Sequence, residues 1–280
     1  MNVERRRSFA DVLVRSIVPL LAFSGSAILS RPIATALGLT GVGSILARGF
    51  APGLLGIAAT VLTERTLDGG SLREAAARLG MARLNAAQIG VAIAATTPLA
   101  AAYAVLFLFL RVSSTPVEHW PLQTLKFIVA QGIAEELIFR GFVFRRLRPG
   151  RTFVRAASLS AVVFSLIHFA NLVNGITPAA LIGLCVSLVF AVILTYPAAD
   201  LFERGGNSIW GFGLLHVAID SINLFMDASA HGVGLVVYCT GIVATVPIVF
   251  WLEQRFLPAR LIHAGGAVTK ASGSGATESG

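Results

Sequence analysis

Two adjacent glutamates and an arginine lie inside a stretch of otherwise apolar sequence. Residues 131–148 read QGIAEELIFRGFVFRRLR, with Glu135, Glu136 and Arg140 ahead of the basic end of the segment. A charged side chain in membrane hydrocarbon costs about 3 kcal/mol or more, so this placement predicts a functional site. Glu136 and Arg140 are four residues apart, and we expect an ion pair between them. Neighbouring helical residues point about 100° apart, so we expect Glu135 to face elsewhere, into a cavity.

Two later apolar segments each carry a histidine at helical spacing from a second residue. Phe164 and His168 are four residues apart, as are His216 and Asp220. A lone histidine such as His168 is more often a packed core residue than a catalyst. For His216 and Asp220 the alternative is a structural hydrogen bond within one helix, although such polar pairs are costly in lipid. The charges near Arg140 also allow a helix end that snorkels to the interface, which explains the arginines better than the glutamates. Taken together, the three segments predict one buried polar site built from several helices.

The composition limits the class of protein that holds this site. Of 280 residues, 55% are hydrophobic and only 13% are charged, which predicts a polytopic membrane protein with an all-α bundle of transmembrane helices. Mean hydropathy is +0.79, which agrees with that class. The net charge of +8 does not indicate nucleic acid, because the basic residues cluster between hydrophobic segments. Cys185 and Cys239 lie in apolar segments and are expected to be packing residues.

The hydrophobic pattern predicts about eight spans and a disordered tail. The expected spans are 12–30, 42–63, 88–110, 122–147, 153–170, 178–200, 207–225 and 232–257. Between the second and third, residues 72–84 predict an amphipathic helix on the membrane surface. The predicted organisation is N-terminal spans with this connector over 1–115, a core over 116–260 and a disordered tail over 261–280.

Basic residues predict the orientation of the spans. With both termini in the cytoplasm, the outer segments and their flanks carry only Arg31, Arg48, Arg111 and Lys126. The inner segments then carry Arg5, Arg6, Arg7, Arg65, Arg73, Arg78, Arg83, Arg145, Arg146, Arg148, Arg151, Arg155, Arg204, Arg255, Arg260 and Lys270. This asymmetry favours cytoplasmic termini and an even number of spans.

The three polar motifs resemble those of a known enzyme family. EELIFR, from Glu135 to Arg140, is similar to the EExxxR motif of the CAAX prenyl protease and bacteriocin-processing (CPBP, or Abi) intramembrane proteases. FSLIH, ending at His168, resembles that family's FxxxH motif, and HVAID, from His216 to Asp220, resembles its third motif. The resemblance covers about residues 120–226 and implies an intramembrane endopeptidase that hydrolyses a peptide bond of a membrane-associated protein or peptide.

The resemblance also implies roles for the matching residues. Glu135, with His168, would be the general base that activates a water. Glu136 and Arg140 would shape and neutralise the site. His216 would stabilise the oxyanion that forms during hydrolysis.

The last motif position departs from the family pattern. Many relatives have asparagine where this chain has Asp220, and an ionised aspartate would repel an oxyanion. We therefore expect Asp220 to orient His216. A competing interpretation is a zinc site, because four of these side chains are acceptable ligands. Its ligands would be Glu135, His168, His216 and Asp220. No HExxH motif occurs in the sequence, and a mechanism without metal or other cofactor is favoured.

Two functions of other classes remain as alternatives. Buried glutamate, histidine and arginine also form proton relays, so a proton-coupled transporter is one alternative, although the inverted repeats typical of transporters are not evident. A catalytically inactive membrane scaffold is the other, although such a relative should have lost some motif residues. The expected partners are a membrane-associated substrate and the lipid bilayer, without nucleic acid. The expected location is a bacterial inner membrane, because the chain is rich in alanine, glycine and arginine.

Overall fold

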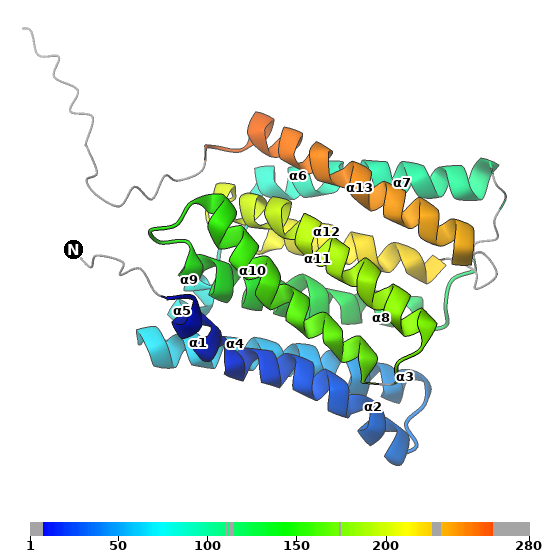
Figure 1. The fold of residues 1–280 in the computed structure, drawn as a ribbon, viewed down its shortest axis with the longest axis horizontal. Helices are drawn as coiled ribbons and strands as arrows, with labels where there is room; N and C mark the ends of the chain where they lie inside the picture. Colours follow the sequence, from blue (N-terminus) through cyan, green and yellow to red (C-terminus); the bar gives the residue numbers. More distant parts are fainter. Residues whose placement is uncertain (1–7, 110, 112–114, 174, 226–230, 260–280) are drawn as a thin grey trace, which may run out of the picture.

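The protein is a bundle of helices (Figure 1). The structure, a computed structural model, describes residues 8–109, 111, 115–173, 175–225 and 231–259. Within these residues every regular element is a helix, of the α, 3-10 or π type. The predicted all-α membrane bundle is therefore confirmed. The predicted tail over 261–280 lies outside the described residues.

Two helical rods form one side of the bundle. Ser8 caps the first rod by accepting a hydrogen bond from the Asp11 amide, and Gly69, at φ +72°, ends the second. The first rod is α1 (Phe9–Leu20), η1 (Leu21–Gly25) and α2 (Ser26–Ala36); the second is α3 (Gly41–Ile45), η2 (Leu46–Phe50) and α4 (Ala51–Asp68).

The connector after α4 is only partly the helix that the sequence predicts. Helix α5 covers Leu72–Arg78 and begins with a capping box between Ser71 and Glu74. Gly80 then has φ +93°, and an added Cβ there would meet the side chain of Phe202. The helix predicted over 72–84 therefore stops early, because the backbone turns at Gly80 against neighbouring elements.

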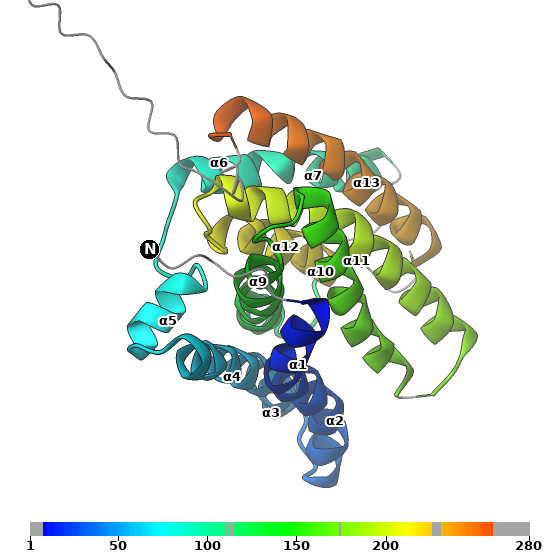
Figure 2. The ribbon, with the colours of Figure 1, turned by 60° about the vertical axis from the view of Figure 1, so that its left-hand side comes forward.

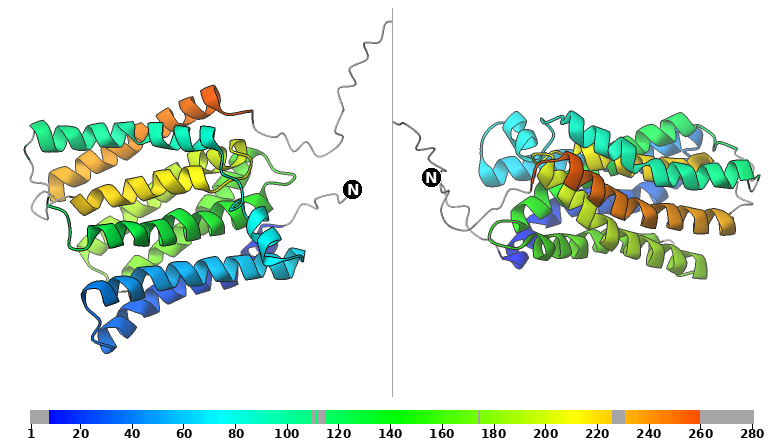
Figure 3. Two further views of the ribbon diagram at one scale, coloured as in Figure 1. Left: turned by 180° about the vertical axis from the view of Figure 1, so that it is seen from behind. Right: turned by 90° about the horizontal axis from the view of Figure 1, so that it is seen from above.

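The opposite side of the bundle is formed by one rod and the C-terminal helix (Figure 3). These helices pack on one another and share an apolar cluster with parts of the core helices, including Leu99, Phe212 and Ile242. The elements are α6 (Ala86–Ala95), α7 (Thr97–Ala104), η3 (Val105–Phe109) and α13 (His231–Phe256).

A single long helical rod crosses the centre. It packs against α1 and α4 on one side and against α10 and α12 on the other, and Figure 2 shows it nearly end-on at α9. Its parts are α8 (Trp120–Phe127), η4 (Ile128–Glu135), η5 (Leu137–Phe144) and α9 (Arg145–Leu147). The other core elements are α10 (Phe153–His168), η6 (Phe169–Leu172), α11 (Pro178–Arg204), α12 (Trp210–Ser221) and η7 (Ile222–Phe225).

Five of the eight predicted spans have the length and composition that a membrane span needs. They are Phe9–Ala36, Gly41–Asp68, Ala86–Phe109, Ala180–Arg204 and Gly232–Phe256. The central rod carries too many charged residues to qualify by composition, and α10 and α12 have only 16 and 12 residues. A helix of 16 residues is about 24 Å long, which is less than the roughly 30 Å hydrocarbon layer. The count of eight stays a prediction.

The connections rich in arginine lie at one end of the bundle. Helices α5 and α9 are at the end where α1 begins (Figure 1). The segments that join α9 to α10 and α11 to α12 lie at the same end, since each helix reverses direction (Figure 3). This arrangement matches the side that the basic residues assign to the cytoplasm, although the orientation itself stays a prediction.

Candidate active site

The glutamate pair lies where the central rod departs from α-helical geometry. The π-type segments Ile128–Glu135 and Leu137–Phe144 flank Glu136. A π turn bonds residue i to i+5 and is wider than an α turn, and such turns are frequent at functional sites. The α-helical spacing expected from the sequence does not predict this local geometry.

One imidazole ring on α12 is the hub of the site. The Nδ1 atom of His216 lies 3.0 Å from Oε1 of Glu136. Its Nε2 atom lies 3.9 Å from Oε2 of Glu135 and 3.8 Å from Oδ2 of Asp220. Both glutamates therefore reach the same ring, Glu136 at Nδ1 and Glu135 at Nε2. The expectation that Glu135 faces a cavity stays a prediction.

The predicted ion pair is present and deeply buried. Nη1 of Arg140 lies 3.0 Å from Oε1 of Glu136, and these residues are 1% and 0% exposed. The guanidinium carbon lies 5.0 Å from the ring centre of Phe164 and 5.1 Å from that of Phe212. Arginine stacked on aromatic rings gains cation–π attraction, which offsets part of the cost of burial. Since Phe164 and Phe212 belong to different apolar clusters, the pair sits where the two clusters meet.

Part of the hydrogen-bonding capacity of this pair is not used inside the protein. Within the described part of the chain, Oε2 of Glu136 and both Nε and Nη2 of Arg140 have no hydrogen-bond partner. Buried polar atoms are almost always paired, and exceptions call for an explanation such as a catalytic role.

His168 ends α10 and faces a cavity that it shares with His216. Its Nδ1 atom lies 3.0 Å from the carbonyl oxygen of Phe164. A carbonyl oxygen only accepts, so Nδ1 donates, and Nε2 of the neutral ring keeps its lone pair. The cavity has a volume of about 120 Å³. It is lined by Phe164, His168, Ser187, Phe190, Ala191, Leu194, His216, Ile219, Asp220, Tyr238 and Ile242.

Two glycines allow α12 to bring His216 close to the glutamates. An added Cβ on Gly132 would lie 2.6 Å from the side chain of Val217 and 3.1 Å from the carbonyl oxygen of Gly213. The central rod and α12 therefore touch backbone to backbone one turn from His216. Small residues permit such close approach between membrane helices.

The orienting contact to His216 differs from the one expected. Glu136 makes the hydrogen bond at 3.0 Å, whereas Asp220, four residues along the same helix, stays 3.8 Å away. A separation of 3.8 Å is too long for a direct hydrogen bond. The expectation that Asp220 holds the ring was drawn from spacing within one helix, whereas the shorter contact comes from another helix.

The structure also reveals residues that the motifs did not signal. Ser187 on α11 and Tyr238 on α13 bring hydroxyl groups to the cavity. Neither stands at a diagnostic spacing from another polar residue, so the sequence offered no signal for them.

For the zinc interpretation, the described residues contain no group of three or more His, Cys, Asp or Glu side chains placed to hold a metal ion. Cys185 and Cys239 are free thiols, as expected for residues not joined in a disulfide.

A second buried charge cluster lies at the arginine-rich end. The carboxylate of Glu64 is fully buried, and Arg146 donates to both Glu64 and Asp68. Two more arginines reach the same carboxylate, Arg78 at 2.9 Å and Arg145 at 2.7 Å. The sequence analysis missed this cluster because its members come from α4, α5 and α9.

Comparison with known proteins agrees with the motifs. Residues 117–222 match the family model described as Rce1-like, type II CAAX prenyl endopeptidase Rce1-like. The matched range contains all six motif residues, from Glu135 to Asp220. This match, together with the helices long and apolar enough to cross a membrane, supports an intramembrane protease of the CAAX-protease-like type. None of the curated proteins matches the chain, and no solved structure matches it.

Proposed function

We propose that the protein hydrolyses a peptide bond of a membrane-associated protein or peptide with a water activated by Glu135 and His168. The observation that carries this proposal is the enclosed cluster in which His216 contacts both glutamates and shares a 120 Å³ cavity with His168. Acids and bases within reach of one cavity meet the geometric requirement of general acid–base catalysis.

Glu135 is the proposed general base. Its carboxylate is not committed to the buried arginine, which bonds Glu136 instead. In the proposed reaction Glu135 takes a proton from water as the oxygen adds to the carbonyl carbon. The carbon–nitrogen bond of the resulting intermediate then breaks, and the proton passes to the leaving amine.

His168 is proposed to assist from the other side of the cavity. Its Nδ1–H is directed to the Phe164 carbonyl, which leaves Nε2 as the atom able to accept a proton or a hydrogen bond from water. A histidine held in one tautomer by a backbone carbonyl suits this role.

His216 is the proposed oxyanion donor, and Glu136 is proposed to position it. The Glu136 carboxylate accepts a hydrogen bond from Nδ1, so His216 is proposed to act as the imidazolium cation, whose Nε2–H donor faces the region between Glu135 and Asp220. Arg140 is proposed to neutralise Glu136. Asp220 is proposed to bias the ring electrostatically rather than by a direct hydrogen bond.

The decisive experiment replaces the base alone. Glu135→Gln keeps size and removes the basic oxygen, so turnover of a membrane-associated peptide by the purified protein should fall at least about a hundredfold. Expression and thermal stability should change little, because the burial of Arg140 does not depend on Glu135. The same assay separates this function from the alternatives, since a transporter or an inactive scaffold would show no cleavage in wild type. Cleavage by Glu135→Gln at a near-normal rate would refute the glutamate mechanism.

The membrane orientation is proposed with both termini in the cytoplasm, in a bacterial inner membrane. The support is the gathering of α5, α9 and the ends of α4 and α11 at one end of the bundle, together with their arginines. A reporter enzyme that is active only in the cytoplasm should be active when it is fused after residue 270. Activity of a periplasmic reporter at the same position would reverse the orientation.

A further inference from the structure

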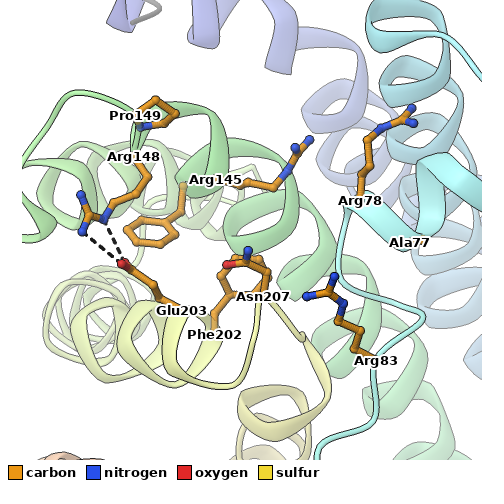
Figure 4. A pocket seen from close by; sticks show the side chains of 10 residues that line it. Ala77, Arg78, Arg83, Arg145, Arg148, Pro149, Phe202, Glu203 and Asn207 are labelled. Atoms are coloured by element: carbon orange, nitrogen blue, oxygen red, sulfur yellow. Dashed lines mark hydrogen bonds and ion pairs between the residues drawn. The ribbon is translucent and has the colours of Figure 1, made fainter. Parts of the chain in front are cut away.

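A basic cavity lies at the end of the bundle, away from the catalytic residues. It has a volume of about 190 Å³ and opens between the connector and the core (Figure 4). Four arginines and one glutamate supply its charged lining. These are Arg78, Arg83, Arg145, Arg148 and Glu203. The excess of positive charge predicts that the cavity attracts an anion.

The arginines differ in how far their donors are already used. All three guanidinium nitrogens of Arg148 already donate, two to the oxygens of Glu203 and one to the carbonyl of Arg151. Arg83 is exposed and donates one hydrogen bond, from Nη1 to the carbonyl of Gly206 at 2.9 Å. Of the hydrogen bonds described, Arg145 uses Nε and Nη2, so its Nη1 is also free. The cavity therefore retains donors on Arg83 and Arg145.

The chemistry of these donors selects a class of ligand. The planar guanidinium forms paired hydrogen bonds to phosphate oxygens, and arginine is the preferred residue for that recognition. Glu203 lies beside Arg204, where the candidate span Ala180–Arg204 ends. The cavity is therefore at the depth where lipid headgroups meet a membrane protein, and basic pockets between helices at this depth bind anionic headgroups.

A neighbouring apolar groove points to a lipid rather than a free ion. Arg83 lines the basic cavity, and the next residue, Leu84, lines a groove of about 240 Å³. Their linings also come close in sequence around the start of α12, where Asn207 lines the cavity and Trp210 lines the groove. Leu84 is 78% exposed, which suits contact with an acyl chain. A phosphate site and an apolar groove side by side match the two halves of a phospholipid.

We propose that this cavity binds the phosphate of an anionic phospholipid headgroup, with Arg83 and Arg145 as donors and the acyl chain along the adjacent groove. Arg83 provides the test because it is exposed and makes a single hydrogen bond, so its replacement leaves the buried ion pairs intact. The matched control is Arg73, an exposed arginine of the same connector that does not line the cavity.

The experiment measures lipid binding by the full-length protein in detergent with native mass spectrometry. The probes are dioctanoyl phosphatidylglycerol, dioctanoyl phosphatidylcholine and inorganic phosphate. Wild type should bind the anionic lipid most tightly. Arg83→Gln should weaken that binding roughly fivefold, as expected for one headgroup-contacting arginine. Arg73→Gln should bind as wild type does, and Arg83→Lys, which keeps charge without the planar fork, should lie between.

Three outcomes would overturn the proposal. Equal loss in Arg83→Gln and Arg73→Gln would mean that only general surface charge attracts the lipid. Equal binding of the two lipids by wild type would show that the cavity is not selective for an anionic headgroup. If inorganic phosphate binds as tightly as the anionic lipid, the ligand of the cavity is free phosphate and not a lipid headgroup. If Arg83→Gln disturbs the fold, the comparison of Arg83→Lys with Arg73→Lys tests the same point.

Discussion

Two of the buried glutamates, Glu64 and Glu136, lie beside cations in different surroundings. At the end of the bundle, both oxygens of Glu64 accept from arginines, and three guanidinium groups surround the carboxylate. At the candidate active site, one oxygen of Glu136 accepts from Arg140 and His216, and the other has no partner among the described residues. Both oxygens of the Glu64 carboxylate thus accept hydrogen bonds, whereas one oxygen of Glu136 can still accept one.

This difference separates a structural cluster from a chemical one. A buried carboxylate whose oxygens all accept from arginine joins elements, here α4 to α5 and α9, and offers nothing to a substrate. A buried carboxylate with an unpartnered oxygen is costly for stability and is typical of a functional site. The comparison predicts that changes at Glu64 act on the fold, whereas changes around Glu136 act on both fold and reaction.

The largest expected effect on stability is that of Glu64→Gln. This change leaves Arg146, which is 4% exposed, without its main buried counter-charge, along with the nearby Arg78 and Arg145. Removing one partner of a buried ion pair costs about 3–5 kcal/mol, and we expect about 4 kcal/mol here. The measurement is thermal unfolding of the purified protein in detergent. The control is Glu74→Gln, where glutamine can keep the capping box, so stability should be unchanged.

Activity should respond differently in the same variant. The Glu64→Gln protein that remains folded should cleave substrate at nearly the wild-type rate per molecule, because Glu64 touches no motif residue. A folded Glu64→Gln variant with little activity would break the distinction between the two clusters.

A smaller loss of stability, combined with a loss of activity, is expected for Glu136→Gln. Glutamine can still accept a hydrogen bond from Arg140, and the rings of Phe164 and Phe212 still stack on the guanidinium. We therefore expect about 3 kcal/mol, at the lower end for a broken buried pair. Turnover should fall as well, since His216 loses its charged partner. Comparison with Glu135→Gln sharpens the assignment: a stable and inactive Glu135→Gln beside an unstable Glu136→Gln is the expected pattern. The reverse pattern would exchange the two roles.

The smallest effect is expected for Asp220→Asn. Because Oδ2 of Asp220 is 3.8 Å from the ring while Glu136 makes the hydrogen bond, turnover should stay within about threefold of wild type. Cleavage by both proteins should also resist a strong chelator. Stoichiometric zinc by elemental analysis, together with chelator-sensitive activity that Asp220→Asn loses, would instead support the zinc interpretation.

The sequence by itself determined the class of protein and the chemistry-bearing positions. Hydrophobic content predicts helices in a membrane, and the i to i+4 spacing of Glu136 and Arg140 predicts their ion pair, which the structure contains. Such inferences succeed because hydropathy and helical spacing are local properties of the chain. The spacing also placed Asp220 beside His216, and the two are neighbours on α12.

Only the tertiary structure decided which groups meet across helices. The sequence could not show that Glu136 rather than Asp220 bonds His216, because that contact depends on how closely α12 and the central rod approach at Gly132 and Gly213. Nor could it show the Glu64 cluster or the basic cavity, which bring together residues from distant segments, such as Glu64 and Arg145, 81 residues apart. Contacts between distant segments depend on helix packing and on local π turns, and neither leaves a periodic signal in one sequence.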